Sequence, residues 1–387
     1  MRKKSIIAAC AALALCAALM TSCGSEIGDT GSLSKKTEAE STAETTTEVT
    51  TAVTEVTTTT AVTTTTPEVT TTKNTAVTLA DEDVFPTTGE WAASDIIIAD
   101  RYNGDKIRAL LPFWCTDSIG QWYGEMINKY KEMVGPDVNV YNMSIPLASQ
   151  FYMPPGFEDA YDDESAAIKN IGSALQDVKN IDLIDTMKAH LNEYIYSRTD
   201  HHWTPLGAYY AVQQFCEEAG VDFVSDLSKY EKCVKEGFCG TMYSFTNVQE
   251  LADHPDTFTY YKPQNEYTTK YYDETFTTAT EGDLFCDWVE GVGCYSVFMG
   301  GDLQIPEITT DVNNGRVLVL IKDSYGNALV PFFVGSFEKI YVVDFRHAEC
   351  KMKDLFEKVG ATDILFGMSI SSGYTPGQIE LMEGMMQ

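Results

Sequence analysis

Two short segments supply the side chains of a candidate nucleophilic catalyst. The first contains Asp200, His201 and His202, and the second, much later in the chain, contains Ser324. A carboxylate, an imidazole and a hydroxyl are the parts of a serine nucleophile system, in which the imidazole accepts the hydroxyl proton and the carboxylate orients the imidazole. Side chains alternate between the two faces of an extended segment, so Asp200 and His202 would share one face and His201 would point to the other. The spacing therefore predicts that Asp200 orients His202.

Ser324 lies at a junction between two kinds of sequence. Residues 317–321 are all apolar, and Ser324 is followed by Tyr-Gly-Asn and a second apolar stretch. We expect a buried strand that turns into a helix here. Such a corner exposes a side chain above the sheet and brings helix N-terminal amides to a developing oxyanion. Asp and Ser also favour the N-cap position of a helix, so the alternative is that Asp323 and Ser324 form only a cap.

The adjacent histidines raise the question of a metal centre. A zinc site needs three or four ligands, and the other histidines in the chain are His190, His254 and His347. The sequence contains neither a Cys-x-x-Cys nor a His-Glu-x-x-His spacing. We therefore predict that the site holds no metal and that the protein uses no cofactor.

Short apolar strands alternating with helices would position these residues. Buried strands are expected at residues 138–143, 317–321, 339–343 and 362–366. Segments with helical periodicity separate them, such as residues 118–134, which end before Gly135 and Pro136. This alternation predicts an α/β fold with a parallel sheet that is covered on both faces. Sites in such sheets form beyond the carboxyl ends of the strands, where Ser324, residues 344–346 and Ser369 all fall.

Residues 221–314 differ from the rest of the domain. The helical period fades there, and Tyr, Thr and Phe become frequent. We expect a β-rich insertion between the base and the nucleophile, near the mouth of the site. Exposed aromatic rings in this segment could stack on sugars, but Tyr and Phe in strands also form ordinary core and cross-strand pairs.

Residues 196–209, which contain Asp-His-His-Trp, resemble the signature of the bacterial DHHW protein family. Their Asp-x-His-Trp core is similar to that of the SGNH-hydrolase-like alginate O-acetyltransferases. Residues 141–154, 322–327 and 342–346 also resemble family segments, so the resemblance covers most of residues 90–387.

The resemblance implies a role for each part of the candidate site. Ser324 would be the nucleophile, His202 the general base and Asp200 its orienting partner. It also implies an SGNH-hydrolase-like (flavodoxin-like) core. Because the Asp-His pair precedes the serine here, that core would be circularly permuted.

The sequence departs from the SGNH pattern at two places. Lys322 replaces the glycine of Gly-Asp-Ser, and no Asn lies near residues 366–369 to serve as an oxyanion donor. Ser369 and Arg346, or a backbone N–H beside Arg346, are the remaining candidates for that role. Arg346 could equally be a structural partner of Asp344.

The N-terminus predicts export. Basic residues 2–4 precede an apolar stretch that reaches Met20 and ends in Thr-Ser-Cys, which resembles a bacterial lipobox. We expect residues 1–22 to be a lipoprotein signal peptide and Cys23 to be lipidated, with secretion after ordinary cleavage as the alternative. The protein would then be exported and lipid-anchored at the outer face of the bacterial cell membrane.

The next segment has an unusual composition. Residues 23–88 are dominated by Thr and contain too few apolar side chains to offset the entropy of folding, so they are expected to form a disordered tether. The folded domain would comprise residues 89–387. Seven of the ten cysteines lie in that domain, where Cys233 with Cys239 or Cys286 with Cys294 could form disulfides, or all could be free thiols.

The charge balance limits the choice of partners. A formal net charge of −30 argues against recruitment of nucleic acid but is compatible with a neutral polysaccharide. The leading hypothesis is a surface-anchored serine esterase or O-acetyltransferase that acts on cell-envelope or extracellular polysaccharide. A transferase would need a separate acyl-donor protein. The alternative is a non-catalytic surface carbohydrate-binding lipoprotein with a decayed SGNH-like site.

Overall fold

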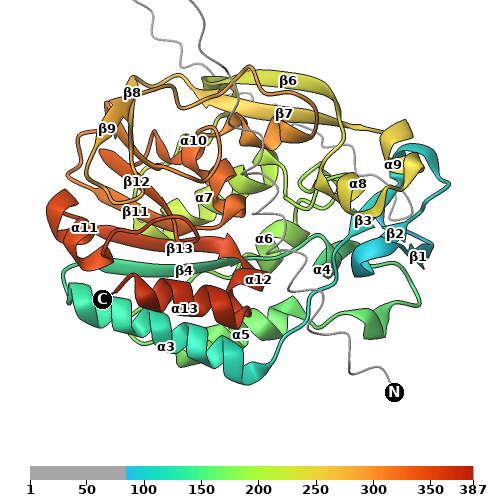
Figure 1. Ribbon diagram of the computed structural model, residues 1–387, viewed down its shortest axis with the longest axis horizontal. Helices are drawn as coiled ribbons and strands as arrows, with labels where there is room; N and C mark the ends of the chain where they lie inside the picture. The colour runs from blue at the N-terminus through green and yellow to red at the C-terminus, as the bar shows by residue number, and fades with distance from the viewer. Residues whose placement is uncertain (1–83, 387) are drawn as a thin grey trace, which may run out of the picture. The chain divides into compact units, whose positions relative to one another are not determined.

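An eight-stranded sheet forms the centre of the computed structural model, which describes residues 84–386 (Figure 1). In spatial order its strands are β5 (Lys179–Asn180), β4 (Asn139–Ile145), β13 (Asp363–Ser369), β11 (Val317–Lys322), β12 (Lys339–Asp344), β10 (Ile305–Thr310), β8 (Tyr267–Tyr272) and β9 (Ala279–Glu281). The pairs from β5 to β12 are parallel, and β10, β8 and β9 join antiparallel. The prediction of an α/β fold with a mostly parallel sheet is confirmed.

Helices cover both faces of the parallel part of the sheet. Figure 1 shows α3 (Asp117–Val134), α5 (Glu164–Ala174) and α13 (Pro376–Gly384) on one face, and α7 (Pro205–Ala219) and α10 (Val330–Phe333) on the other. Strands β11 and β13 are therefore buried almost along their whole length. Burial on both faces explains why these strands read as continuous apolar runs instead of alternating ones.

Four smaller groups of elements complete the described part of the fold. Strands β1 (Gly89–Trp91), β2 (Ile97–Ala99) and β3 (Arg108–Leu110) form an antiparallel sheet, and β6 (Tyr230–Phe238) pairs with β7 (Asp256–Pro263). The remaining α-helices are α4 (Ser149–Tyr152), α6 (Ile184–Lys188), α8 (Thr241–Thr246), α9 (Gln249–Asp253), α11 (Met352–Val359) and α12 (Ile370–Gly373). Short 3₁₀ helices are η1 (Ala93–Asp95), η2 (Gly104–Lys106), η3 (Glu158–Ala160), η4 (Leu227–Lys229), η5 (Gly291–Val297) and η6 (Ser324–Leu329).

Residues 221–314 are rich in β-structure, as predicted. They contain β6 and β7 as a separate ribbon, while β8, β9 and β10 extend the main sheet. Along the chain, β4 and β5 come before this segment and β11, β12 and β13 after it, although β13 lies between β4 and β11 in the sheet. That the segment is an insertion, and that the core is circularly permuted, remain predictions.

The N-terminal predictions lie largely outside the described residues. These are the signal peptide, the lipidation of Cys23 and the tether up to residue 83. Within residues 84–386, no helix has the length and apolar character needed to cross a membrane. All seven cysteines in this range are free thiols, namely Cys115, Cys216, Cys233, Cys239, Cys286, Cys294 and Cys350.

Candidate active site

The loop that carries the histidines is closed at its base and held against the serine corner. Tyr196 and Trp203 form an isolated antiparallel bridge, and α7 begins directly after the loop. Trp203 is fully buried, and its Nε1–H donates to the carbonyl of Tyr325 at 3.0 Å. This hydrogen bond joins the histidine loop to the residue that follows Ser324.

Ser324 lies at the predicted corner between a strand and a helix. Strand β11 ends at Lys322, and Asp323 caps η6 by accepting a hydrogen bond from the backbone N–H of Tyr325 at 2.9 Å. The cap interpretation therefore holds for Asp323, and the nucleophile role of Ser324 stays a prediction. Because Asp323 performs the capping, the hydroxyl of Ser324 is left available to another partner.

The three predicted residues form one hydrogen-bonded chain. His202 Nδ1 lies 2.6 Å from Asp200 Oδ1, and His202 Nε2 lies 2.8 Å from Ser324 Oγ. An ionised carboxylate only accepts hydrogen bonds, so the proton of a neutral His202 resides on Nδ1. Nε2 then carries a lone pair, and the hydroxyl of Ser324 donates to it. The arrangement can transfer the serine proton to the imidazole.

Asp200 is buried and its carboxylate is fully paired. Oδ1 also accepts the backbone N–H of His202 at 3.0 Å, while Oδ2 accepts both the N–H and the hydroxyl of Thr241 at 2.9 Å each. Burial by itself would raise the pKa of Asp200, but the charge and hydrogen bond of His202, together with His201 and Thr241, hold this pKa well below its ordinary value. Asp200 is therefore ionised when it orients His202.

Thr241 is a residue that the sequence reasoning missed. It begins α8, which packs with β2 and β3 around a small apolar cluster that includes Ile98 and Met242. A Cβ on the preceding Gly240 would lie 2.4 Å from Asp200 Cβ, so only glycine allows α8 to approach this closely. The Gly-Thr pair at a helix start was the available signal, but nothing in the sequence links it to Asp200.

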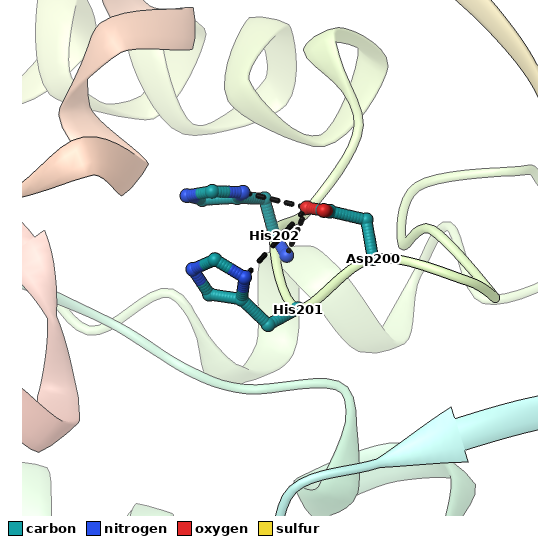
Figure 2. A group of neighbouring side chains, drawn as sticks. All are labelled: Asp200, His201 and His202. Carbon is teal, nitrogen blue, oxygen red and sulfur yellow. Dashed lines mark hydrogen bonds and ion pairs between the residues drawn. The ribbon is translucent and has the colours of Figure 1, made fainter. Parts of the chain in front are cut away.

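His201 does not lie where the alternation rule places it. The segment is a bend and not an extended strand, and Figure 2 shows both imidazoles on the same side of Asp200. The two rings are 3.7 Å apart at an angle of 39°. The prediction that His201 points away from Asp200 is wrong, because a bend does not have the side-chain period of two. His202 differs from His201 instead by its contacts with Asp200 and Ser324.

Tyr295 covers the other face of His202. Its ring stacks on the imidazole with centroids 3.7 Å apart and an angle of 4° between the planes. The Tyr295 hydroxyl donates to the carbonyl of Tyr325 at 3.2 Å. Tyr295 belongs to η5, in the β-rich segment, so this part of the chain encloses His202 from the side opposite His201. The sequence offered no signal that distinguished Tyr295 from the other tyrosines.

Lys322, which replaces the SGNH glycine, is buried in an ion cluster below the corner. Its Nζ donates to Asp302 at 2.7 Å and to Asp344 at 2.8 Å. Arg346 contacts the same two carboxylates through Nε and Nη2. Burial opposes ionisation of Asp302 and Asp344, but the two cations hold the pKa of each below its ordinary value. A Cβ on Gly326 would lie 2.5 Å from Lys322 Cβ, so a glycine in η6 makes room for the lysine.

The two oxyanion candidates have different surroundings. Arg346 is the structural partner of Asp344 that one interpretation expected, and within the described residues no hydrogen bond involves its Nη1. The N–H and hydroxyl of Ser369 both donate to Asp323 Oδ2, at 3.0 and 2.7 Å, and Ser372 donates there as well. A hydroxyl has one hydrogen. In this geometry that hydrogen is directed to Asp323, so Ser369 would have to give up this hydrogen bond to serve an oxyanion, and its role stays a prediction.

Within residues 84–386, Asp200, His201 and His202 are also the group that could offer metal ligands. Their donor atoms all lie within 4.8 Å of one another. However, Nδ1 of each histidine faces a hydrogen-bond partner, and both carboxylate oxygens accept hydrogen bonds. A metal would have to displace these contacts, so the donor set fits a hydrogen-bond network better. The expectation of a metal-free site stays a prediction.

The fold and site define a mixed α/β protein with an Asp-His-Ser constellation beyond the carboxyl end of β11, a central strand of a mostly parallel sheet. The sequence profile described as "DHHW protein" matches residues 87–343, so the chain belongs to the DHHW family. None of the curated proteins searched matches it. A crystal structure of a DHHW family protein from Eubacterium siraeum shares 40% identity and has a TM-score of 0.72, covering 77% of this chain and 97% of that one.

Two more distant structures were also similar to this chain, and their TM-scores lie on either side of 0.5. Bacillus cereus PatB1, solved with a sulfonyl adduct, is 18% identical with a TM-score of 0.60, over 74% of this chain and 99% of that one. The O-acetyltransferase domain of Pseudomonas putida AlgJ is 14% identical, over 77% and 99% of the two chains, but its TM-score is 0.38. The first shows the fold alone, and the second is too dissimilar to support an inference.

Proposed function

We propose that this protein is a serine O-acetyltransferase or esterase that acts on a polysaccharide. The observation that carries the proposal is the continuous chain from Asp200 through His202 to Ser324, with atoms 2.6 and 2.8 Å apart. A solvated loop would not hold three such groups in this order. The ring of Tyr295 further fixes the orientation of His202, and the hydroxyl of Thr241 fixes the carboxylate of Asp200.

The first half-reaction forms an acetyl-enzyme. His202 Nε2 accepts the proton of Ser324, and Ser324 Oγ attacks the carbonyl carbon of an acetyl ester. The ester's alcohol leaves with the proton from His202. Ser324 is the first residue of η6, and its backbone N–H makes no hydrogen bond within the described residues, so this N–H is the leading donor to the oxyanion. Arg346 Nη1 is the second candidate.

The second half-reaction moves the acetyl group to an acceptor. A hydroxyl gives its proton to His202 and its oxygen attacks the acetyl carbon, after which Ser324 leaves and regains a proton. Water as the acceptor makes an esterase, and a sugar hydroxyl makes a transferase. The net charge of −30 favours a neutral polysaccharide over a polyanionic one.

The test compares wild type with Ser324→Ala on two substrates, p-nitrophenyl acetate and acetylated xylan. We expect wild type to release p-nitrophenol and acetate, and the variant to lose at least a thousandfold in rate. If wild type releases neither product while it binds polysaccharide, the protein is a carbohydrate-binding member with a decayed site. The replacement of glycine by Lys322 and the missing oxyanion Asn are the features that would then explain the inactivity.

Surface anchoring through Cys23 is part of the same proposal. The apolar stretch that ends in Thr-Ser-Cys supports lipidation at this residue. A transferase held at the outer face of the membrane would receive its acetyl groups from a separate donor protein. Replacing Cys23→Ala should release the protein or stall its processing, as measured by membrane fractionation. A processed variant that still sediments fully with membranes would contradict the anchor.

A further inference from the structure

His201 has a defined hydrogen-bonding role that the first half-reaction does not use. Its Nδ1 lies 2.6 Å from Thr241 Oγ, and Thr241 Oγ lies 2.9 Å from Asp200 Oδ2. The carboxylate cannot donate, so the single hydroxyl hydrogen of Thr241 points to Asp200. Thr241 must then accept from His201, which places a hydrogen on Nδ1 of His201. Its Nε2 consequently carries a lone pair when the ring is neutral.

This lone pair lies on the reacting side of the site. Figure 2 shows the outer nitrogens of His201 and His202 side by side on the edge away from Asp200. The outer nitrogen of His202 is the one that contacts Ser324 Oγ at 2.8 Å. The side chain of His201 is 17% exposed, and within the described residues Nε2 has no hydrogen-bond partner. Since the two rings are 3.7 Å apart, this unpaired acceptor lies beside the imidazole that contacts Ser324.

His201 also stays neutral while His202 changes its protonation. Burial, followed by the charge of His202, lowers the pKa of His201 to about 3. The two rings are 3.7 Å apart, so a proton gained by His202 repels a second proton from His201. A neutral imidazole with a hydrogen on Nδ1 is an acceptor at Nε2 throughout the reaction.

We propose that His201 positions the acceptor, with Nε2 accepting a hydrogen bond from a second O–H group of the incoming nucleophile. This inference rests on the proposed function and deepens it. The attacking oxygen gives one hydrogen to His202 Nε2 and forms a bond to the acetyl carbon. The bond from that carbon to Ser324 Oγ then breaks, and His202 donates the same hydrogen to Ser324 Oγ. The hydrogen bound by His201 is a different one, and it stays on its oxygen.

The chemistry defines a class of acceptor. Water has a second hydrogen on the attacking oxygen, and a sugar with neighbouring hydroxyls offers one on the adjacent oxygen. An alcohol with an isolated hydroxyl offers neither. The site should therefore prefer a vicinal diol, as found in many sugar units, over an isolated alcohol of similar size.

Two substitutions distinguish the role of Nδ1 of His201, which donates to Thr241, from that of Nε2, which would accept from the nucleophile. In His201→Asn, the amide can occupy the place of Nδ1 and donate to Thr241, but nothing reaches the place of Nε2. In His201→Gln, the longer side chain can present an acceptor near the place of Nε2. The full-length protein is acetylated with p-nitrophenyl acetate, and the burst of p-nitrophenol is compared with the rate of acetyl-enzyme decay. The rates at which trans-1,2-cyclohexanediol and cyclohexanol take the acetyl group from the acetyl-enzyme are measured in parallel.

The expected result is a selective effect on the second half-reaction. His201→Asn should give a normal burst, an acetyl-enzyme that decays in water about tenfold more slowly, and no preference for the diol. His201→Gln should recover part of the decay rate. Unchanged decay and preference in His201→Asn would overturn the proposal. So would an equal slowing of burst and decay in both variants, which indicates a structural role. A wild type that releases no p-nitrophenol, either as a burst or in steady turnover, refutes the proposed function itself, and the role of His201 with it.

Discussion

The parallel core and the β-rich segment contribute to the site in different ways. The core provides Ser324 at the end of a buried strand, where residue type and position follow from a pattern visible in the sequence. The segment 221–314 provides Thr241, Tyr295 and Asp302, which contact Asp200, His202 and Lys322 from outside the core. The comparison indicates that the core places Ser324, whereas the β-rich segment holds His202, Asp200 and the buried Lys322 in position.

The largest effects should come from the residues that form the chain itself. Ser324→Ala and His202→Ala should each lower turnover of an acetyl ester by three or more orders of magnitude. The double variant should be little worse than either single one, because neither residue works without the other. Steady-state kinetics on all three proteins check this. Multiplicative losses in the double variant would show that Ser324 and His202 act independently.

Removal of a supporting ring should have a smaller effect. Tyr295→Leu should lower kcat about tenfold, because His202 loses the stacked partner on one face. Tyr295→Phe keeps the ring and loses only the hydroxyl contact with Tyr325, so it should stay within about threefold of wild type. If Leu and Phe variants are equally active, the β-rich segment does not position the base.

Acid sensitivity tests the burial of His201. The folded protein keeps His201 neutral down to a pKa of about 3, whereas the unfolded chain binds a proton below about 6.5. Protons therefore favour unfolding as pH falls from 6.5 toward 3. Each pH unit in this window costs up to about 1.4 kcal/mol, and less because the ring is partly exposed. Urea unfolding measures the free energy of unfolding at pH 7 and pH 5. Between these pH values His201→Asn should lose about 1 kcal/mol less of this free energy than wild type.

The smallest effect is expected outside the domain. Deleting residues 24–83 should leave the thermal midpoint of the protein nearly unchanged, because this Thr-rich segment has little apolar surface to bury. Differential scanning calorimetry on the full chain and the deletion variant measures this. A midpoint that falls by several degrees would show that the segment packs on the domain.

Patterns in the local sequence predicted individual helices and strands correctly. Helix 118–134 matches α3, which ends at Gly135 with a φ of 78°, and the apolar runs match β11, β12 and β13. The proximity of Asp200, His202 and Ser324 was also anticipated. The failures have a common cause, which is tertiary structure. The chain bends at His201, so its side chains do not alternate between two faces. The hydroxyl of Ser369 donates a hydrogen bond to Asp323, which the sequence did not indicate. Thr241 and Tyr295 reach the site only through folding of a distant segment.

Covalent labelling tests the central claim that Asp200, His202 and Ser324 form a working nucleophile. Wild type, His202→Ala, His201→Asn and Ser324→Ala are treated with a sulfonyl fluoride, and modified peptides are identified by mass spectrometry. We predict one label, on Ser324, in wild type and in His201→Asn, and none in the other two. Labelling of His202→Ala at the wild-type rate, or failure of wild type to label at Ser324, would contradict the account.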